Sequence, residues 1–201
     1  MSDNSTTLKP ERAVLVGLSH RDQNAEKLSE YMDELEFLAH TLGLETIKSF
    51  TQNLDAPNPK TFIGTGKLNE IVQFSKENDI DVVVFDDDLT PSQLRNLEKE
   101  IELKIYDRSL LILDIFQARA QTSQSKTQVE LARYEYLLPR LTRMWTHLER
   151  QRGGTATRGG SGEKEIETDR RLIRDQIALL KKKLQKIDKQ MRTQRGNRGA
   201  M

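Results

Sequence analysis

The chain has 201 residues, a formal net charge of +1 at pH 7, 31% charged and 5% aromatic residues, and no cysteine. This length fits one sizeable domain, or one domain with an appendage, and the composition is typical of long exposed helices. Without cysteine, disulfides, thiolate metal sites and cysteine nucleophiles are excluded. Because the amino terminus is polar and Asp114 interrupts the longest apolar run, we expect a cytoplasmic protein with no signal peptide and no transmembrane segment.

Charge is strongly segregated along the chain. Residues 76–102 hold three basic and nine acidic side chains, whereas residues 181–198 hold eight basic and one acidic side chain. A segment as basic as the second one indicates a polyanionic partner, and the acidic segment suits solvent or a basic partner.

The first part of the chain alternates predicted strands and helices, after a tail at residues 1–11 that we expect to be disordered. Apolar, β-branched runs predict strands at residues 12–18, 44–50, 81–85 and 104–106. Apolar residues at helical spacing predict helices at residues 22–42, 66–74, 91–101 and 109–120. Since strands joined by helices form right-handed crossovers, we predict an α/β domain over residues 12–122, with a small, mainly parallel sheet and flanking helices.

Two local signals fix helix ends within this domain. Gly43 follows the first helix and suits the left-handed conformation that ends many helices. Thr90 and Gln93 form a capping box, with Pro91 at the first helical position, so the helix that runs to Ile101 has a well-defined start.

The second part of the chain carries two apolar stripes that predict an antiparallel, coiled-coil-like helical hairpin over residues 123–195. The first stripe consists of Leu131, Tyr134, Leu138, Leu141, Trp145 and Leu148, and the second of Ile166, Ile173, Ile177, Leu180, Leu184, Ile187 and Met191. Pro139 lies inside the first helix, where it removes a hydrogen bond and predicts a kink. Residues 150–162 form the predicted tip.

Three groups of residues are candidates for a catalytic, cofactor-binding or metal site. Gly64, Gly66 and Lys67 are weak cofactor-binding candidates, because a P-loop requires a glycine and a Ser or Thr at the positions of Thr61 and Leu68; a turn before a helix is favoured. Three consecutive aspartates at residues 86–88 could hold Mg²⁺ through waters, but a solvated loop is favoured. The three histidines are scattered, so neither a metal site nor a catalytic constellation is predicted.

The predicted hairpin tip is the strongest candidate for a binding site. It holds five glycines and three arginines but no large apolar residue, and it is longer than a turn between two helices requires. Glycine allows close backbone approach, and arginine grips phosphates or stacks on exposed bases. The predicted nucleic-acid-binding residues are Arg143, His147, Arg150, Arg152, Gly153, Gly154, Arg158, Gly159 and Gly160.

Four stretches of the sequence are long and distinctive: RNLEKEIELKIYDRSLLILDIFQARAQT, KTQVELARYEYLLPRLTRMWTHLERQRGG, IETDRRLIRDQI and FIGTGKLNEI. They resemble the amino-terminal part of HflX-type ribosome-associated GTPases. The resemblance runs from about Arg12 to Arg195 and implies an α/β subdomain and a helical hairpin, followed in that family by a G domain. Residues 196–201 would then be the linker to a G domain that the sequence lacks, and GTP and Mg²⁺ are expected only with that domain.

The resemblance also implies partners and a role. It implies that the tip contacts large-subunit ribosomal RNA, in ribosome splitting or rescue, and that the chain is a monomer that binds no DNA. The tip sequence GGTATRGGSGEKE departs from the family pattern GGIGxRGPGETQ, since it lacks the proline and has one extra residue. Two other interpretations remain open: a nucleotide-binding domain in its own right, with ATP near residues 64–67, and a helical protein-interaction module that dimerises.

Overall fold

The structure is a computed structural model that describes residues 9–19, 25–141 and 162–198. It divides into two compact units: a sheet unit, Met1–Leu111, and a helical unit, Ile112–Met201. The dividing point falls inside helix α4 (Arg108–Arg119), whereas the sequence predicts a boundary after residue 122.

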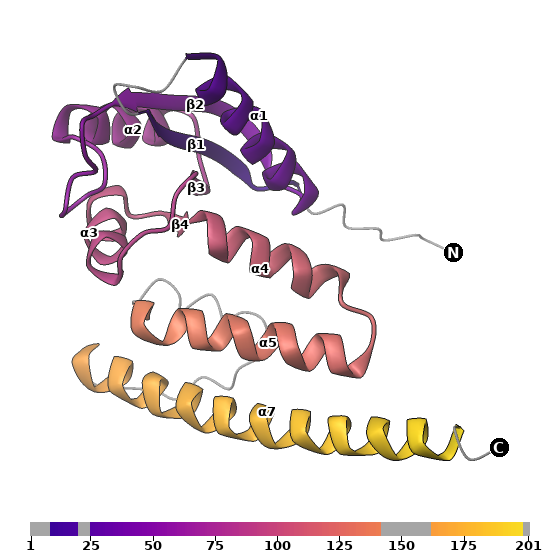
Figure 1. Ribbon diagram of the computed structural model, residues 1–201. Coiled ribbons are helices and arrows are strands. Elements are labelled where there is room, and N and C mark those ends of the chain that lie inside the picture. Colours follow the sequence, from indigo (N-terminus) through magenta and orange to yellow (C-terminus); the bar gives the residue numbers. More distant parts are fainter. Residues whose placement is uncertain (1–8, 20–24, 142–161, 199–201) are drawn as a thin grey trace, which may run out of the picture. The chain divides into compact units, whose positions relative to one another are not determined.

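Four parallel strands form the centre of the sheet unit (Figure 1). They are β1 (Arg12–Ser19), β2 (Glu45–Asn53), β3 (Val82–Phe85) and β4 (Lys104–Tyr106), and they lie side by side in the order β2-β1-β3-β4. All three strand pairs are parallel. The α/β fold with a small parallel sheet is therefore confirmed. Because β1 and β3 are central strands buried on both faces, they are continuous apolar runs rather than alternating ones.

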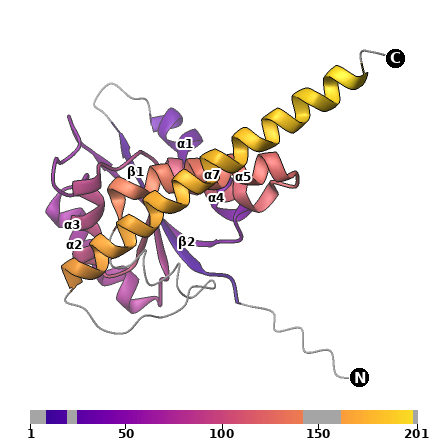
Figure 2. The ribbon, with the colours of Figure 1, turned by 90° about the horizontal axis from the view of Figure 1, so that it is seen from below.

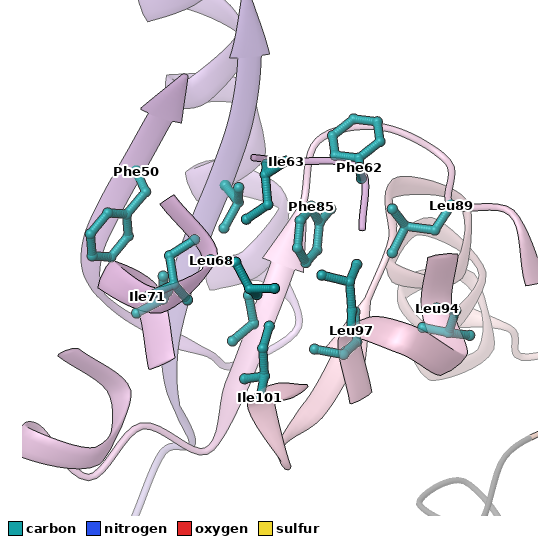
Figure 3. Packing of buried hydrophobic residues seen from close by; sticks show 14 of the residues in the cluster. Phe50, Phe62, Ile63, Leu68, Ile71, Phe85, Leu89, Leu94, Leu97 and Ile101 are labelled. Atoms are coloured by element: carbon teal, nitrogen blue, oxygen red, sulfur yellow. The ribbon is translucent and has the colours of Figure 1, made fainter. Parts of the chain in front are cut away.

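Three helices connect the strands and cover the sheet: α1 (Ala25–Thr41), α2 (Thr65–Glu77) and α3 (Pro91–Ile101). Figure 3 shows one face of the sheet, where side chains of α2 and α3 such as Leu68, Ile71 and Leu97 meet Phe85 of β3 in one buried cluster. On the other face β1 approaches α1 so closely that a Cβ atom at Gly17 would lie 2.4 Å from the sulfur of Met32. A larger residue at this crossing would require the Met32 side chain to move.

The helix ends follow the local signals in the sequence. Gly43 adopts a left-handed φ of +90° after α1. At the start of α3 the Thr90 hydroxyl accepts a hydrogen bond from the Gln93 amide at 3.1 Å, and the Gln93 side chain accepts one from the Thr90 amide at 3.0 Å. The predicted capping box is thus confirmed, with Pro91 at the first helical position.

The helical unit contains the rest of α4, then α5 (Ser123–Leu137), a short 3-10 helix η1 (Leu138–Arg140) and the long helix α7 (Gly162–Arg198). Two contacts show that α5 and α7 run antiparallel, as Figures 1 and 2 also show. Glu135 pairs with Lys181 at 2.8 Å, and the side-chain amide of Gln124 donates a hydrogen bond to the Asp188 carboxylate at 3.0 Å. This pairing agrees with the predicted hairpin.

The chain at Pro139 differs from the predicted kink within one long helix. The α-helix ends at Leu137, and Pro139 lies in the 3-10 turn that follows. Leu141 then leaves helical geometry with a ψ of 124°. The ring of a proline inside a helix clashes with the carbonyl four residues earlier. Because the α-helix ends before Pro139, this clash is avoided. Among the residues that the structure describes, no helix is both long and apolar enough to cross a bilayer.

Candidate nucleic-acid interface

The nine predicted nucleic-acid-binding residues, from Arg143 to Gly160, lie outside the described residues. These are Arg143, His147, Arg150, Arg152, Gly153, Gly154, Arg158, Gly159 and Gly160. What the structure describes of this interface is the pair of helices on either side of them, α5 with η1 before and α7 after.

An apolar seam holds these helices together. Ile177 and Leu180 of α7 and Leu141 after η1 are buried, and Leu131, Tyr134 and Leu138 of the predicted first stripe are partly buried. The remaining described stripe residues of α7, from Ile166 to Met191, are partly buried, whereas Leu172 and Leu179 are 57% and 59% exposed. The predicted heptad seam is therefore the face of α7 that packs, and its opposite face is turned to solvent.

A buried ion pair joins α4 to α5 beside this seam. Arg133 Nε lies 2.6 Å from Asp114 Oδ1, and the two side chains are only 6% and 5% exposed. Asp114, which interrupts the most apolar stretch of the sequence, therefore has a structural role. A buried pair of this kind fixes the register of two helices, because breaking it by removing one partner is strongly destabilising.

The described cations of α7 form an exposed basic surface. Lys181, Lys182, Lys183, Lys186, Lys189 and Arg192 are all exposed. Lys182, Lys186 and Lys189 are spaced by four and three residues, so they share one stripe of the helix, about 180° from the seam residues Leu180, Leu184 and Ile187. We call these three residues the lysine stripe. Ammonium groups in a row on a solvent-facing helix can contact successive phosphates of a polyanion.

The charge count over residues 181–198 indicates this surface, but none of its lysines is among the predicted nucleic-acid-binding residues. Their helical spacing is the signal that would have found them. Lys182, Lys186 and Lys189 repeat at the same intervals as the apolar seam, displaced by half a turn of the helix.

The three aspartates at residues 86–88 lie at the carboxyl end of β3, and they contact other residues of the sheet unit. Arg108 bridges Asp86 and Glu34 at 2.7 Å each. Asp88 accepts a hydrogen bond from the Ser109 amide at 3.1 Å, at the start of α4. Burial raises the pKa of Asp86, although the hydrogen bond and charge of Arg108 act in the opposite direction. These contacts favour a loop over a magnesium site, but Asp86 is paired and largely buried rather than solvated as predicted.

The described ranges hold no group of three or more His, Asp or Glu side chains placed to bind a metal ion. The weak cofactor candidates are also engaged within the sheet unit. The Gly64 amide donates to the Gln52 side chain at 2.9 Å, and Lys67 pairs with Glu70 at 2.7 Å. The hydrogen bond from Lys67 lowers the pKa of Glu70. This glycine-containing segment is the entry to α2, as the turn interpretation predicts.

Comparison with known proteins gives matches along most of the chain. Residues 29–117 match the family model for the GTP-binding GTPase N-terminal region, and residues 119–198 match that for the GTP-binding GTPase middle region. GTPase HflX of Flavobacterium psychrophilum is 60% identical over 97% of this chain and 47% of its own length. GTPase HflX of Escherichia coli strain K12 is 45% identical over 94% of this chain and 43% of its own length.

A solved structure shows the same fold at low sequence identity. It is the crystal structure of a GTP-binding protein from the hyperthermophilic archaeon Sulfolobus solfataricus in complex with GDP. It is 22% identical to this chain, with a TM-score of 0.60 over 89% of this chain and 46% of that one.

The parallel sheet unit and the paired helices thus correspond to the N-terminal and middle regions of GTP-binding GTPases. Within that class, the chain belongs to the HflX family. It spans about half the length of the curated relatives that it matches.

Proposed function

We propose that this chain is a cytoplasmic ribosome-binding module that contacts the RNA of the large ribosomal subunit through residues 150–162 and acts in ribosome splitting or rescue. In this proposal the module works with a GTP-binding G domain of the full-length protein, which takes the GTP and Mg²⁺, and it binds neither by itself. It acts as a monomer and has no affinity for DNA at its working salt concentration.

The observation that carries the proposal is the lysine stripe of α7. It faces solvent opposite the seam, and it belongs to the helix that begins where the predicted tip ends. Lys182 lies twenty residues after Gly162, so the helix places the stripe about 30 Å from the start of α7. We infer that the tip and the stripe contact separate stretches of RNA backbone, the tip also reaching exposed bases.

Titration with purified large ribosomal subunits tests the proposal. The triple variant Arg150→Ala, Arg152→Ala, Arg158→Ala should bind more weakly than the wild type, with the melting temperature nearly unchanged. A matched control removes three exposed cations from the sheet unit: Lys76→Ala, Arg95→Ala, Lys99→Ala. Equal affinity of wild type and the arginine variant would remove the predicted tip from the interface.

The same preparation separates the two other interpretations. Labelled ATP titrated against the chain should show no saturable binding, and GTP should give no micromolar affinity by calorimetry. Sedimentation equilibrium should show a monomer. ATP binding that is lost on Lys67→Ala would favour a nucleotide-binding domain, and a dimer that dissociates on changing Leu172 or Leu179 would favour a protein-interaction module.

A further inference from the structure

Helix α1 carries the most exposed large apolar side chain in the part of the chain that the structure describes. Phe37 is 67% exposed, ahead of Leu179, Leu172 and Phe116. The face of α1 that packs on the sheet holds Met32, Leu35 and Ala39. At 100° per residue, Phe37 lies almost opposite the centre of that face, so no repacking of α1 on its own sheet would cover it.

Acidic side chains precede this phenylalanine along the exposed face of α1. Glu30 and Asp33 precede it by seven and four residues, which places them on the same stripe of the helix. They and the adjacent Glu36 are exposed and have no ion-pair partner among the described residues. Over the whole of α1 there are five acidic side chains and one lysine. The solvent face of this helix is therefore an acidic stripe that ends at an aromatic ring.

A hollow adjoins the ring. It has a volume of about 490 Å³ and is lined by Asp33, Glu36, Phe37 and His40 of α1 and by Leu44 and Glu45 at the start of β2. Leu44 is only 4% exposed, so Phe37 provides the accessible apolar surface of the hollow. The three carboxylates that line the hollow belong to Asp33, Glu36 and Glu45. The volume is sufficient for one or two large side chains of a partner.

We propose that this face of α1 binds a Lys- or Arg-rich protein segment that inserts a large apolar side chain beside Phe37. Charge complementarity decides between the classes of partner. Carboxylates at residues 30, 33, 36 and 45 repel a phosphate backbone and attract ammonium and guanidinium groups. The Phe37 ring supplies the apolar contact that anchors such a segment, as in interfaces that combine an apolar anchor with a charged rim.

The two proposed surfaces thus take partners of opposite charge. The lysine stripe of the helical unit is suited to RNA, and the acidic face of α1 to a basic segment of protein. The second proposal does not depend on the first, because it uses only residues of the sheet unit.

A phage-displayed library of short random peptides, selected on the intact chain, tests this inference. Peptides that bind the wild type are counter-selected on Phe37→Ser, which changes a side chain outside the core and should leave the melting temperature unchanged. We expect the enriched peptides to combine net positive charge with at least one large apolar residue. Their synthetic versions should lose about tenfold or more in affinity for Phe37→Ser.

Two further variants make the test specific. The pair Asp33→Asn, Glu36→Gln should weaken the same peptides and flatten the salt dependence of their binding. Phe116→Ser removes an apolar side chain that is 56% exposed in the helical unit, and it should leave peptide affinity unchanged. Enrichment of neutral or acidic peptides, no enrichment at all, or equal binding to Phe37→Ser would overturn the proposal. So would a labelled RNA, or a second copy of the chain, whose binding is lost on Phe37→Ser.

Discussion

The two units of this chain are stabilised in different ways. In the sheet unit, the central strands are buried on both faces, and Val14, Phe50, Val83 and Ile105 belong to one cluster that spans all four strands. In the helical unit, α5 and α7 share a narrow seam of apolar side chains, beside the buried ion pair between α4 and α5. Because few side chains form this seam, we expect a single substitution to lower the stability of the helical unit far more than that of the sheet unit.

The largest expected effect concerns the buried ion pair. Arg133→Ala removes the guanidinium that pairs with the buried Asp114 carboxylate, which should destabilise the helical unit by about 3–5 kcal/mol. Hydrogen exchange should show loss of protection in α5 and α7 while β1 and β3 stay protected. The double change Asp114→Leu, Arg133→Met should recover most of the loss. Uniform loss of protection in both units would contradict their different modes of stabilisation.

A charge within the seam comes next. Ile177 is 9% exposed, so Ile177→Asp removes apolar burial and puts a carboxylate where only apolar side chains pack. We expect a loss of about 3 kcal/mol, with lower protection along α5 and α7. Leu179→Asp, two residues away on the exposed face, is the matched control and should change stability little. Equal effects of the two changes would show that the seam is not the packed face.

A smaller effect is expected in the sheet unit. Thr90→Ala removes the hydroxyl that accepts from the Gln93 amide at the start of α3, which should cost about 1 kcal/mol. Thr90→Ser keeps the acceptor and should cost less. The midpoint of urea unfolding should fall, while the slope of the unfolding free energy against urea concentration should not change. If alanine and serine behave alike, the capping box does not stabilise α3.

The smallest expected effect on stability is that of the lysine stripe. Lys182→Ala, Lys186→Ala, Lys189→Ala changes only exposed side chains, and alanine is a good helix former, so the melting temperature should hardly move. A clear loss of stability would mean that the stripe packs against part of the chain, and it would contradict a solvent-facing surface.

The sequence allowed most of the sheet unit to be predicted, because its signals are local. The buried run of β3, Gly43 after α1 and the Thr90 capping box each require only a few neighbouring residues, and the structure confirms them. The bridge from Arg108 to Asp86 and Glu34 could not be predicted in this way, since it joins residues 22 and 74 positions apart.

The surfaces were harder to predict than the core. Net charge showed that residues 181–198 are basic, but the lysine stripe becomes apparent only once the seam defines which side of α7 packs. Phe37 falls outside the apolar spacing of its helix, from Leu28 to Leu42, and that departure was itself a signal of an exposed ring. A binding surface consists of side chains that stay exposed after the elements have packed together. Local sequence patterns do not show which side chains those are.

The central claim is that the helical unit binds ribosomal RNA by neutralising phosphates, and the salt dependence of binding tests it most directly. Affinity for large ribosomal subunits should fall with salt at a logarithmic slope of about −0.7 to −0.9 per phosphate contact. Replacing Arg150, Arg152 and Arg158 by alanine should flatten that slope by roughly one unit per lost contact, and replacing the lysine stripe should flatten it again. Identical slopes for the wild type and both well-folded variants would contradict the account.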